Sequence, residues 1–436
     1  MKSLFRSAKS KMLVLKLANY LIGAVVAIAL ARFLGAEGYG SYAFVFSIVL
    51  ILVLPAGFGL PYFLLRETVR LSQDQRNNEI GQIWRWSGLV ILASSALIFL
   101  LVYVVTRVTG YGPASPELFW LGMLVIPFMA GGAVRAGALQ ALGYPFAAQF
   151  PQMVLRQGLL VVIFLLAAYF SSKAASSPET AMAANLAGAI IAFGIGLYLL
   201  SRVAPPMPSI PPISAAPHRM WLTSAFWMGT GQGAQKLNGN MDIILLGILA
   251  TASDVGIYKA VVVAGTTTIF AVQAIELALM PRLAKLAIEG DKAGLVRASV
   301  RAAREIMAFG GVIIAGLVIF GETLLNLAFG AEFSEGYVTL LIVALGKASF
   351  YLFGPVRPLL NMTGNEKHIG PVMAQAVVVN IAACIILIPY FGYLGAACAL
   401  LISSWFWNIR LYLLVRLKLG FDCSAIGRPS TKISAE

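Results

Sequence analysis

Apolar residues dominate this chain in runs of about 20 residues, and short polar segments separate the runs. A helix of about 20 apolar residues crosses the ~30 Å hydrocarbon core of a bilayer. The pattern therefore predicts an all-α polytopic membrane protein. The twelve helices that it predicts cover residues 13–34, 41–65, 83–106, 117–142, 149–170, 181–201, 220–248, 254–280, 301–321, 337–361, 369–390 and 393–416.

Two connecting segments differ from the short loops elsewhere. Residues 202–219 are rich in proline, which cannot continue a helix, and they predict a cytoplasmic linker. The linker separates an N-terminal six-helix lobe (1–201) from a C-terminal six-helix lobe (220–418), which a cytoplasmic tail (419–436) follows. The segment 282–300 is basic and amphipathic, and it predicts a surface helix.

The two predicted lobes carry a sparse internal repeat. "GYGSYAF" at 38–44 aligns with "DVGIYKA" at 254–260, and a later alignment pairs Arg135 with Arg357. The repeat predicts two lobes related by pseudo-two-fold symmetry around a central cavity. It also makes the first apolar run the partner of the seventh, so we expect a structural helix there and not a cleaved signal peptide. Gly35 and its neighbouring glycines predict a turn between the first two helices.

Composition supports the membrane class. Hydrophobic residues make up 59% of the chain and charged residues 11%, against about 25% charged in soluble domains. The net charge of +14 follows topology, because most Lys and Arg fall in segments on one side of the membrane. This distribution predicts cytoplasmic N- and C-termini and contact with anionic lipid heads, and it argues against nucleic acid as a partner.

The polar stretch "TGQGAQKLNGNMD" at 230–242 interrupts apolar sequence. On a continuous helix over 220–248, its polar side chains cover one broad face. A charge near the middle of a membrane helix is costly, so this face must meet protein or water. We expect it to form a wall of the cavity, together with an asparagine of the first helix. The predicted wall residues are Gln232, Gln235, Lys236, Asn238, Asn240 and Asn19.

Other charges also fall inside predicted spans. The cations are Arg135, Arg156, Lys347 and Arg357, and the acids are Asp242 and Glu276. Because cations are in excess, the cavity should attract an anion. Asp242 and Glu276 are candidates for coupling to H⁺ or Na⁺, and the alternative is that they neutralise Lys236 or Lys347. For Arg135 and Arg357, an alternative is that the side chain reaches the membrane interface.

Signals for catalysis or metal binding are missing from the sequence. The three cysteines and two histidines have no metal-ligand or disulfide spacing, and no catalytic motif occurs in a suitable context. We therefore expect no enzyme, no catalytic residue, no metal and no cofactor. An integral glycosyltransferase is disfavoured because no long loop carries paired carboxylates, and a scaffold is disfavoured by the polar face at 230–242.

Three blocks of sequence carry a resemblance. They are "LARFLGAEGYGSYAFVFSIV" (30–49), "MDIILLGILATASDVGIYKA" (241–260) and "GNEKHIGPVMAQAVVVNIAACIILIPYFGYLGAACALLISS" (364–404). Together with twelve predicted spans, they resemble the polysaccharide transporter, or oligosaccharide flippase, family of the multidrug/oligosaccharidyl-lipid/polysaccharide exporter superfamily. The chain is shorter than fourteen-helix relatives, which disfavours the role of a peptidoglycan-precursor flippase.

The resemblance implies a flippase for undecaprenyl-pyrophosphate-linked oligosaccharide in the bacterial inner membrane, working by alternating access of two lobes. Its implied partners are the anionic lipid-linked saccharide and the bilayer, with a polysaccharide polymerase or other assembly proteins as further candidates. The cations would bind the anionic groups, and the amides would bind sugar hydroxyls. The alternative is a cation-coupled multidrug exporter of the same superfamily that uses Asp242 or Glu276, which the excess of cations disfavours.

Overall fold

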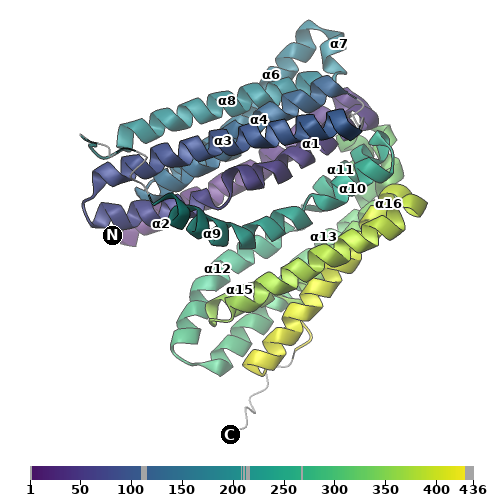
Figure 1. Ribbon diagram of the computed structural model, residues 1–436. Helices are drawn as coiled ribbons and strands as arrows, with labels where there is room; N and C mark the ends of the chain where they lie inside the picture. Colours follow the sequence, from purple (N-terminus) through teal and green to yellow (C-terminus); the bar gives the residue numbers. More distant parts are fainter. Residues whose placement is uncertain are drawn as a thin grey trace. The chain divides into compact units, whose positions relative to one another are not determined.

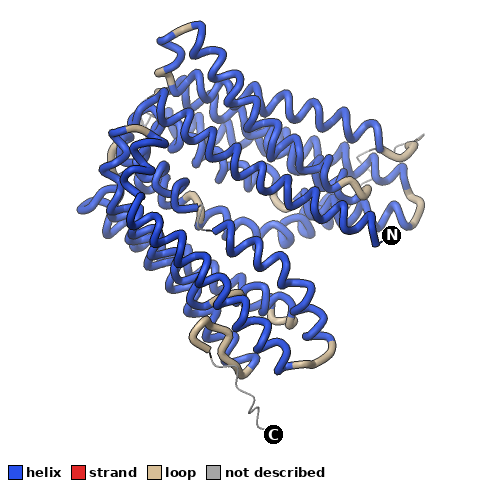
Figure 2. Tube along the Cα trace, turned by 180° about the vertical axis from the view of Figure 1, so that it is seen from behind, coloured by secondary structure: helices blue, strands red, loops and turns tan. Residues whose placement is uncertain are grey.

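The computed structural model describes residues 2–109, 115–207, 209, 212, 217–266 and 269–427. Every regular element in these ranges is a helix (Figure 2). Eight helical segments of the described chain are long and apolar enough to cross a bilayer. The prediction of an all-α polytopic membrane protein is therefore confirmed.

Contacts divide the chain into two compact units, Met1–Lys236 and Leu237–Glu436. The first unit contains α1 (Lys2–Gly57), α2 (Leu60–Gln73), α3 (Asn77–Thr109), α4 (Pro116–Ala141), α5 (Pro145–Phe150), the π-helical turn η1 (Pro151–Leu155), α6 (Arg156–Phe170), α7 (Ser172–Ala175), α8 (Pro178–Val203) and most of α9 (His218–Asn238). The second unit contains α10 (Met241–Leu249), α11 (Ala252–Thr266), α12 (Ile269–Ile288), α13 (Lys292–Phe329), the 3₁₀ turn η3 (Ala331–Gly336), α14 (Tyr337–Phe353), α15 (Val356–Met362), the 3₁₀ turn η4 (Glu366–His368) and α16 (Ile369–Leu419). The lobes and linker drawn from the repeat stay a prediction.

Helix α1 is a hairpin of two arms. Its 56 residues would be about 84 Å long if straight, far more than one bilayer core. Gly35 breaks it with φ 68°, a left-handed conformation that favours glycine. Both arms reach the start of α6: a Cβ on Gly23 would lie 3.5 Å from Gln157 Oε1, and Phe46 lies under the Arg156 guanidinium. The predicted turn at Gly35 is thus confirmed.

Helix α16 folds back in the same way. Its 51 residues are interrupted at Gly392, which has φ 52°. Across the hairpin, the Ser403 hydroxyl donates a hydrogen bond to the carbonyl oxygen of Ala376 at 3.0 Å. A Cβ on Gly395 would lie 2.4 Å from the carbonyl oxygen of Leu387, so the tip of the hairpin has no room for a side chain there. This break falls where the predicted helices 369–390 and 393–416 meet.

Four predicted elements are corrected. The helix predicted over 41–65 is broken at Phe58–Gly59, where α1 has ended and α2 has not begun. The helix predicted over 220–248 is broken at Gly239–Asn240, where glycine and asparagine are poor helix formers, and becomes α9 and α10. The helix predicted over 337–361 is broken by Gly354, which has φ 68°. The surface helix predicted over 282–300 does not exist as one element, because the end of α12 and the beginning of α13 share this segment.

Within the first unit, the beginning of α9 packs against α2 and α3 (Figure 1). The rings of Trp221 and Trp86 lie 5.1 Å apart, and those of Phe226 and Phe58 lie 5.0 Å apart. A Cβ on Gly59 would lie 1.9 Å from the Ala225 carbonyl oxygen, so glycine is required for this approach. These contacts make the start of α9 part of the first unit.

We predict that Gly395→Ala destabilises the second unit by about 1–3 kcal/mol, because the new methyl group meets the Leu387 carbonyl. The control is Gly316→Ala in α13, where nothing lies within 4 Å of the added Cβ. Loss of backbone freedom in the unfolded chain should make that variant neutral or about 0.5–1 kcal/mol more stable. Thermal unfolding of the purified variants in detergent compares the two, and equal melting temperatures would contradict the packing argument.

Candidate functional site

The first unit buries the guanidinium of Arg135 on α4. Arg135 is 3% exposed, and its terminal nitrogen donates to the Ala148 carbonyl oxygen at 3.2 Å. Its Nε and its other terminal nitrogen have no hydrogen-bond partner. A Cβ on Gly196 would lie 1.8 Å from the guanidinium, so a glycine on α8 gives the charge its space. Snorkelling to the interface is therefore not how this side chain is accommodated.

Arg156, the first residue of α6, connects three helices of the first unit. It donates to Asn185 Oδ1 at 2.8 Å, and the Asn185 amide donates to the Tyr42 hydroxyl at 3.0 Å. Its guanidinium carbon lies 5.7 Å from the centre of the Phe46 ring, in a cation–π contact. Arg156 is 8% exposed, yet its Nε has no partner. One donor of this buried cation is thus not used by the protein.

Two glutamines beside Arg156 were missed by the sequence analysis. Gln152 Nε2 and Gln157 Oε1 are buried without hydrogen-bond partners. Gln152 fills the space that Gly132 leaves on α4. Gln152 lies within the π-helical turn η1 and Gln157 just after it, and Pro151 begins the turn because it lacks the N–H of a regular helix turn. The sequence does contain a signal for these two residues, because their amide side chains interrupt an apolar run. We call Arg135, Gln152, Arg156 and Gln157 the π-turn polar set.

The π-turn polar set has cations without acids. Among the described residues, neither Arg135 nor Arg156 has a carboxylate within ion-pair distance. Asn19, predicted to lie in the cavity wall, is half-buried on α1, one helical turn before Gly23, which approaches Gln157. The first unit therefore offers positive charge and free amide groups in one region of α1, α4 and α6.

The polar stretch at 230–242 differs from the prediction of one continuous wall. Gln232 and Gln235 lie in α9, but their side chains are outside the described part of the structure. Lys236 is in the last turn of α9 and exposed, so it does not lie deep in a helix. Asn238 is half-buried and its Oδ1 has no partner, whereas half-buried Asn240 precedes α10.

Asp242 belongs to a separate polar group in the second unit. It is 3% exposed; the Tyr258 hydroxyl donates to its Oδ2 at 2.5 Å, and the Ile243 backbone N–H donates to its Oδ1 at 2.9 Å. The positive charges of Lys347 and Lys259 act on the carboxylate, without a direct ion pair among the described residues. Both carboxylate oxygens are thus already bound by donors of the protein.

The other predicted charged residues of the second unit are Arg357, Glu276 and Lys347. Arg357 on α15 places its guanidinium carbon 5.5 Å from the centre of the Trp407 ring. Its charge acts on Glu276 of α12. Lys347 on α14 places its Nζ 5.8 Å from the centre of the Phe350 ring. In the second unit, buried Asp242 and half-buried Glu276 therefore each have a cation in their neighbourhood, unlike the π-turn polar set, which has no acid.

Comparison with known proteins identifies the family of this chain. A family model described as "Polysaccharide biosynthesis protein" matches residues 10–287, well over half of the chain. The "Probable low-salt glycan biosynthesis flippase Agl15" of Haloferax volcanii is 25% identical over 166 residues. That match covers 37% of this chain and 34% of the relative, so it spans about a third of the relative's length.

Two solved structures share the fold over nearly all of the chain. An inward-facing multidrug resistance MATE family transporter of the MOP superfamily has a TM-score of 0.76 and 15% identity, covering 92% of this chain and 94% of its own. The lipid II flippase MurJ in an inward closed conformation has a TM-score of 0.75 and 15% identity, covering 93% of this chain and 87% of its own. At this identity the likeness shows the fold alone.

We predict that Tyr258→Phe lowers the free energy of unfolding by about 1–3 kcal/mol, because it leaves a buried carboxylate oxygen without its donor. Asp242→Asn alone, and combined with Tyr258→Phe, completes a double-mutant cycle. The cycle measures the coupling energy between the two side chains. Tyr169→Phe is the control, since Tyr169 is 84% exposed. If the effects of Tyr258→Phe and Asp242→Asn simply add, the hydrogen bond contributes no stability of its own.

Proposed function

Because the chain belongs to the polysaccharide biosynthesis protein family, we propose that it flips an anionic lipid-linked oligosaccharide across a membrane. The substrate class is an undecaprenyl-pyrophosphate-linked oligosaccharide, and the membrane is the bacterial inner membrane with both termini cytoplasmic. The observation that carries the proposal is the burial of Arg135 and Arg156 without a carboxylate partner among the described residues. An anion is the ligand that this charge favours.

The chemistry of the π-turn polar set fits both parts of such a substrate. Guanidinium donors form charge-assisted hydrogen bonds with phosphate oxygens, and Arg135 and Arg156 keep donors free. The free amide groups of Gln152 and Gln157 fit sugar hydroxyls. Alternating access of two lobes around a central cavity would expose these groups to each side in turn. A polysaccharide polymerase is a candidate partner that receives the flipped product.

The cations outside the π-turn polar set take a secondary place in this proposal. Lys347 lies near Asp242, and Arg357 lies near Glu276, so each has a neighbouring negative charge in the protein. Lys236, at the end of α9, remains a candidate for contact with the substrate because its side chain is exposed. Asp242 and Glu276 remain candidates for ion coupling, and their neighbouring cations support neutralisation as the alternative.

We predict that Arg156→Gln and Arg135→Gln each reduce transport about tenfold or more, because each removes charge-assisted hydrogen bonds to the anion. The measurement is surface polysaccharide in cells whose own copy of the gene is deleted, at matched protein level in the membrane. Arg202→Gln is the control, since this exposed arginine of α8 contacts only Tyr198 among the described residues. Lys236→Ala and Lys347→Ala test the cavity predicted from the sequence in the same assay. Normal polysaccharide in both arginine variants would refute the anion site.

The second candidate is a cation-coupled drug exporter, which buried Asp242 and half-buried Glu276 favour. Such an exporter should remove cationic dyes from cells, and Asp242→Asn should abolish the pH dependence of that efflux. We expect no dye efflux, because a buried excess of cations repels a cationic ligand. Dye efflux that requires Asp242, together with normal polysaccharide in the arginine variants, would reverse the order of the two functions.

A further inference from the structure

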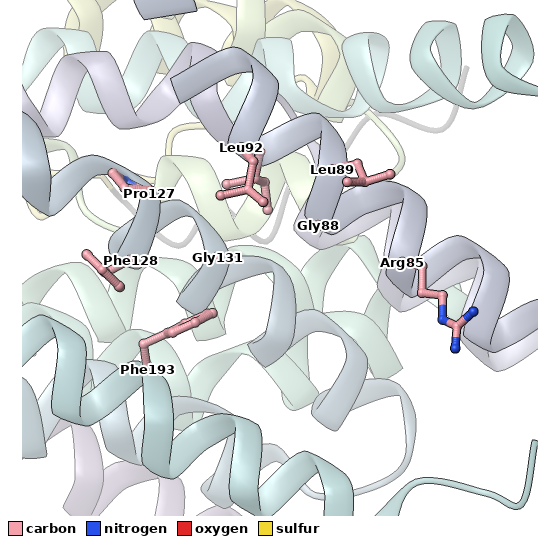
Figure 3. A pocket seen from close by; sticks show the side chains of 9 residues that line it. Arg85, Gly88, Leu89, Leu92, Pro127, Phe128, Gly131 and Phe193 are labelled. Atoms are coloured by element: carbon pink, nitrogen blue, oxygen red, sulfur yellow. The ribbon is translucent and has the colours of Figure 1, made fainter. Parts of the chain in front are cut away.

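An apolar crevice lies on the first unit between α3, α4 and α8 (Figure 3). Its volume is about 600 Å³, in the range of small-molecule sites. Leu89 and Leu92 of α3 line one side, and Phe128 and Phe193 line the other. Nothing lies within 4 Å of a Cβ built on Gly88, so the crevice is open beside that glycine. The lining is almost entirely apolar, with one charged residue.

The charged residue is Arg85, at one end of the crevice (Figure 3). Arg85 has no hydrogen-bond or ion-pair partner among the described residues, whereas Arg76, directly before α3, is paired with Glu79. Helix α3 has 33 residues and is about 50 Å long, so about 10 Å extends beyond the hydrocarbon core at each end if the helix is centred. Arg85 lies about 12 Å from its beginning, just inside the edge of the hydrocarbon core, from where its long side chain can reach the lipid head groups.

The crevice continues from Arg85 into the hydrocarbon level. Gly88, Leu89 and Leu92 lie about 4–11 Å deeper along α3, where the acyl chains of a bilayer are. Leu89 is 53% exposed and Leu92 is 62% exposed, so this side of the crevice is open to lipid. A ligand with a phosphate at one end and a hydrocarbon chain at the other matches this order of groups.

We propose that this crevice binds one anionic phospholipid of the surrounding leaflet, with its phosphate at Arg85 and an acyl chain along Gly88, Leu89 and Leu92. Charge complementarity selects this occupant. The crevice presents a single cation, which matches a head group with one negative charge, whereas a pyrophosphate-linked lipid carries more charge than Arg85 alone can balance. The site is separate from the π-turn polar set, and it does not depend on the proposed transport activity.

The test is lipid binding to the purified full-length protein in detergent, measured by native mass spectrometry. Dioleoyl-phosphatidylglycerol and dioleoyl-phosphatidylcholine have equal chains and differ in head-group charge. We expect the wild type to bind the glycerol lipid more tightly, and Arg85→Gln to weaken that binding about tenfold. Arg107→Gln is the control, because Arg107 is exposed at the other end of α3 and contacts Tyr103.

A second variant tests the site proposed for the acyl chain without removing the charge of Arg85. Gly88→Leu fills the crevice where a side chain has space, and leucine is a better helix former than glycine, so this variant should fold. We expect it to weaken binding of both lipids. Equal binding of the two lipids by wild type and Arg85→Gln would overturn the head-group contact, and unchanged binding by Gly88→Leu would overturn the crevice. Retention of a polyprenyl phosphate but neither phospholipid would overturn the proposal in favour of the transported lipid.

Discussion

The cost of placing charge within a membrane protein governs the arrangement of this chain. A charged residue near the bilayer centre costs at least about 2.5–3.5 kcal/mol unless protein or water solvates it. The second unit meets this constraint by placing a cation near a buried acid, as Lys347 is placed near Asp242. The first unit surrounds Arg135 and Arg156 with a carbonyl oxygen, an amide oxygen and an aromatic ring. These neutral groups stabilise a guanidinium but leave its net charge uncompensated.

Small residues make this burial sterically feasible. Gly196 on α8 gives space to the Arg135 guanidinium, and Gly132 on α4 gives space to Gln152. A Cβ on Gly188 would lie 2.8 Å from the carbonyl oxygen of Arg156, so α8 also approaches the beginning of α6 closely. Glycine in membrane helices allows this close approach. The glycines and the polar side chains are therefore two parts of one arrangement, and enlarging a glycine would displace a charge.

Much of the fold could be predicted from the sequence, because span length and hydropathy depend on the bilayer and not on tertiary detail. For the same reason, the breaks at Gly35 and Gly392 fall between predicted spans. The break at Gly239 was missed, since a helical pattern on both sides conceals an interruption of one or two residues. That miss also explains Lys236, which is deep only if 220–248 is a single helix. Contacts inside a unit, such as Tyr258 with Asp242, depend on packing that no local pattern shows.

The candidate site shows the same division between what was predicted and what was not. A charge in an apolar run is a strong signal, so Arg135 and Arg156 could be identified from the sequence. A single amide is a weak signal, because it can hydrogen-bond within its own helix, and Gln152 and Gln157 were therefore missed. Their importance depends on the helices around them and on their lack of partners, which only the structure shows.

The hairpin of α1 explains how neighbouring residues of α6 can both contact the same helix. Consecutive helix residues point about 100° apart, so a single neighbouring helix cannot easily contact both. Gly35 lies nearly midway between Gly23 and Phe46, and the reversal there brings both residues to one level of α6. Gln157 then meets the first arm at Gly23, while Arg156 meets the second arm at Phe46. A single left-handed glycine thus places one arm of α1 against the charge and the other against the amide.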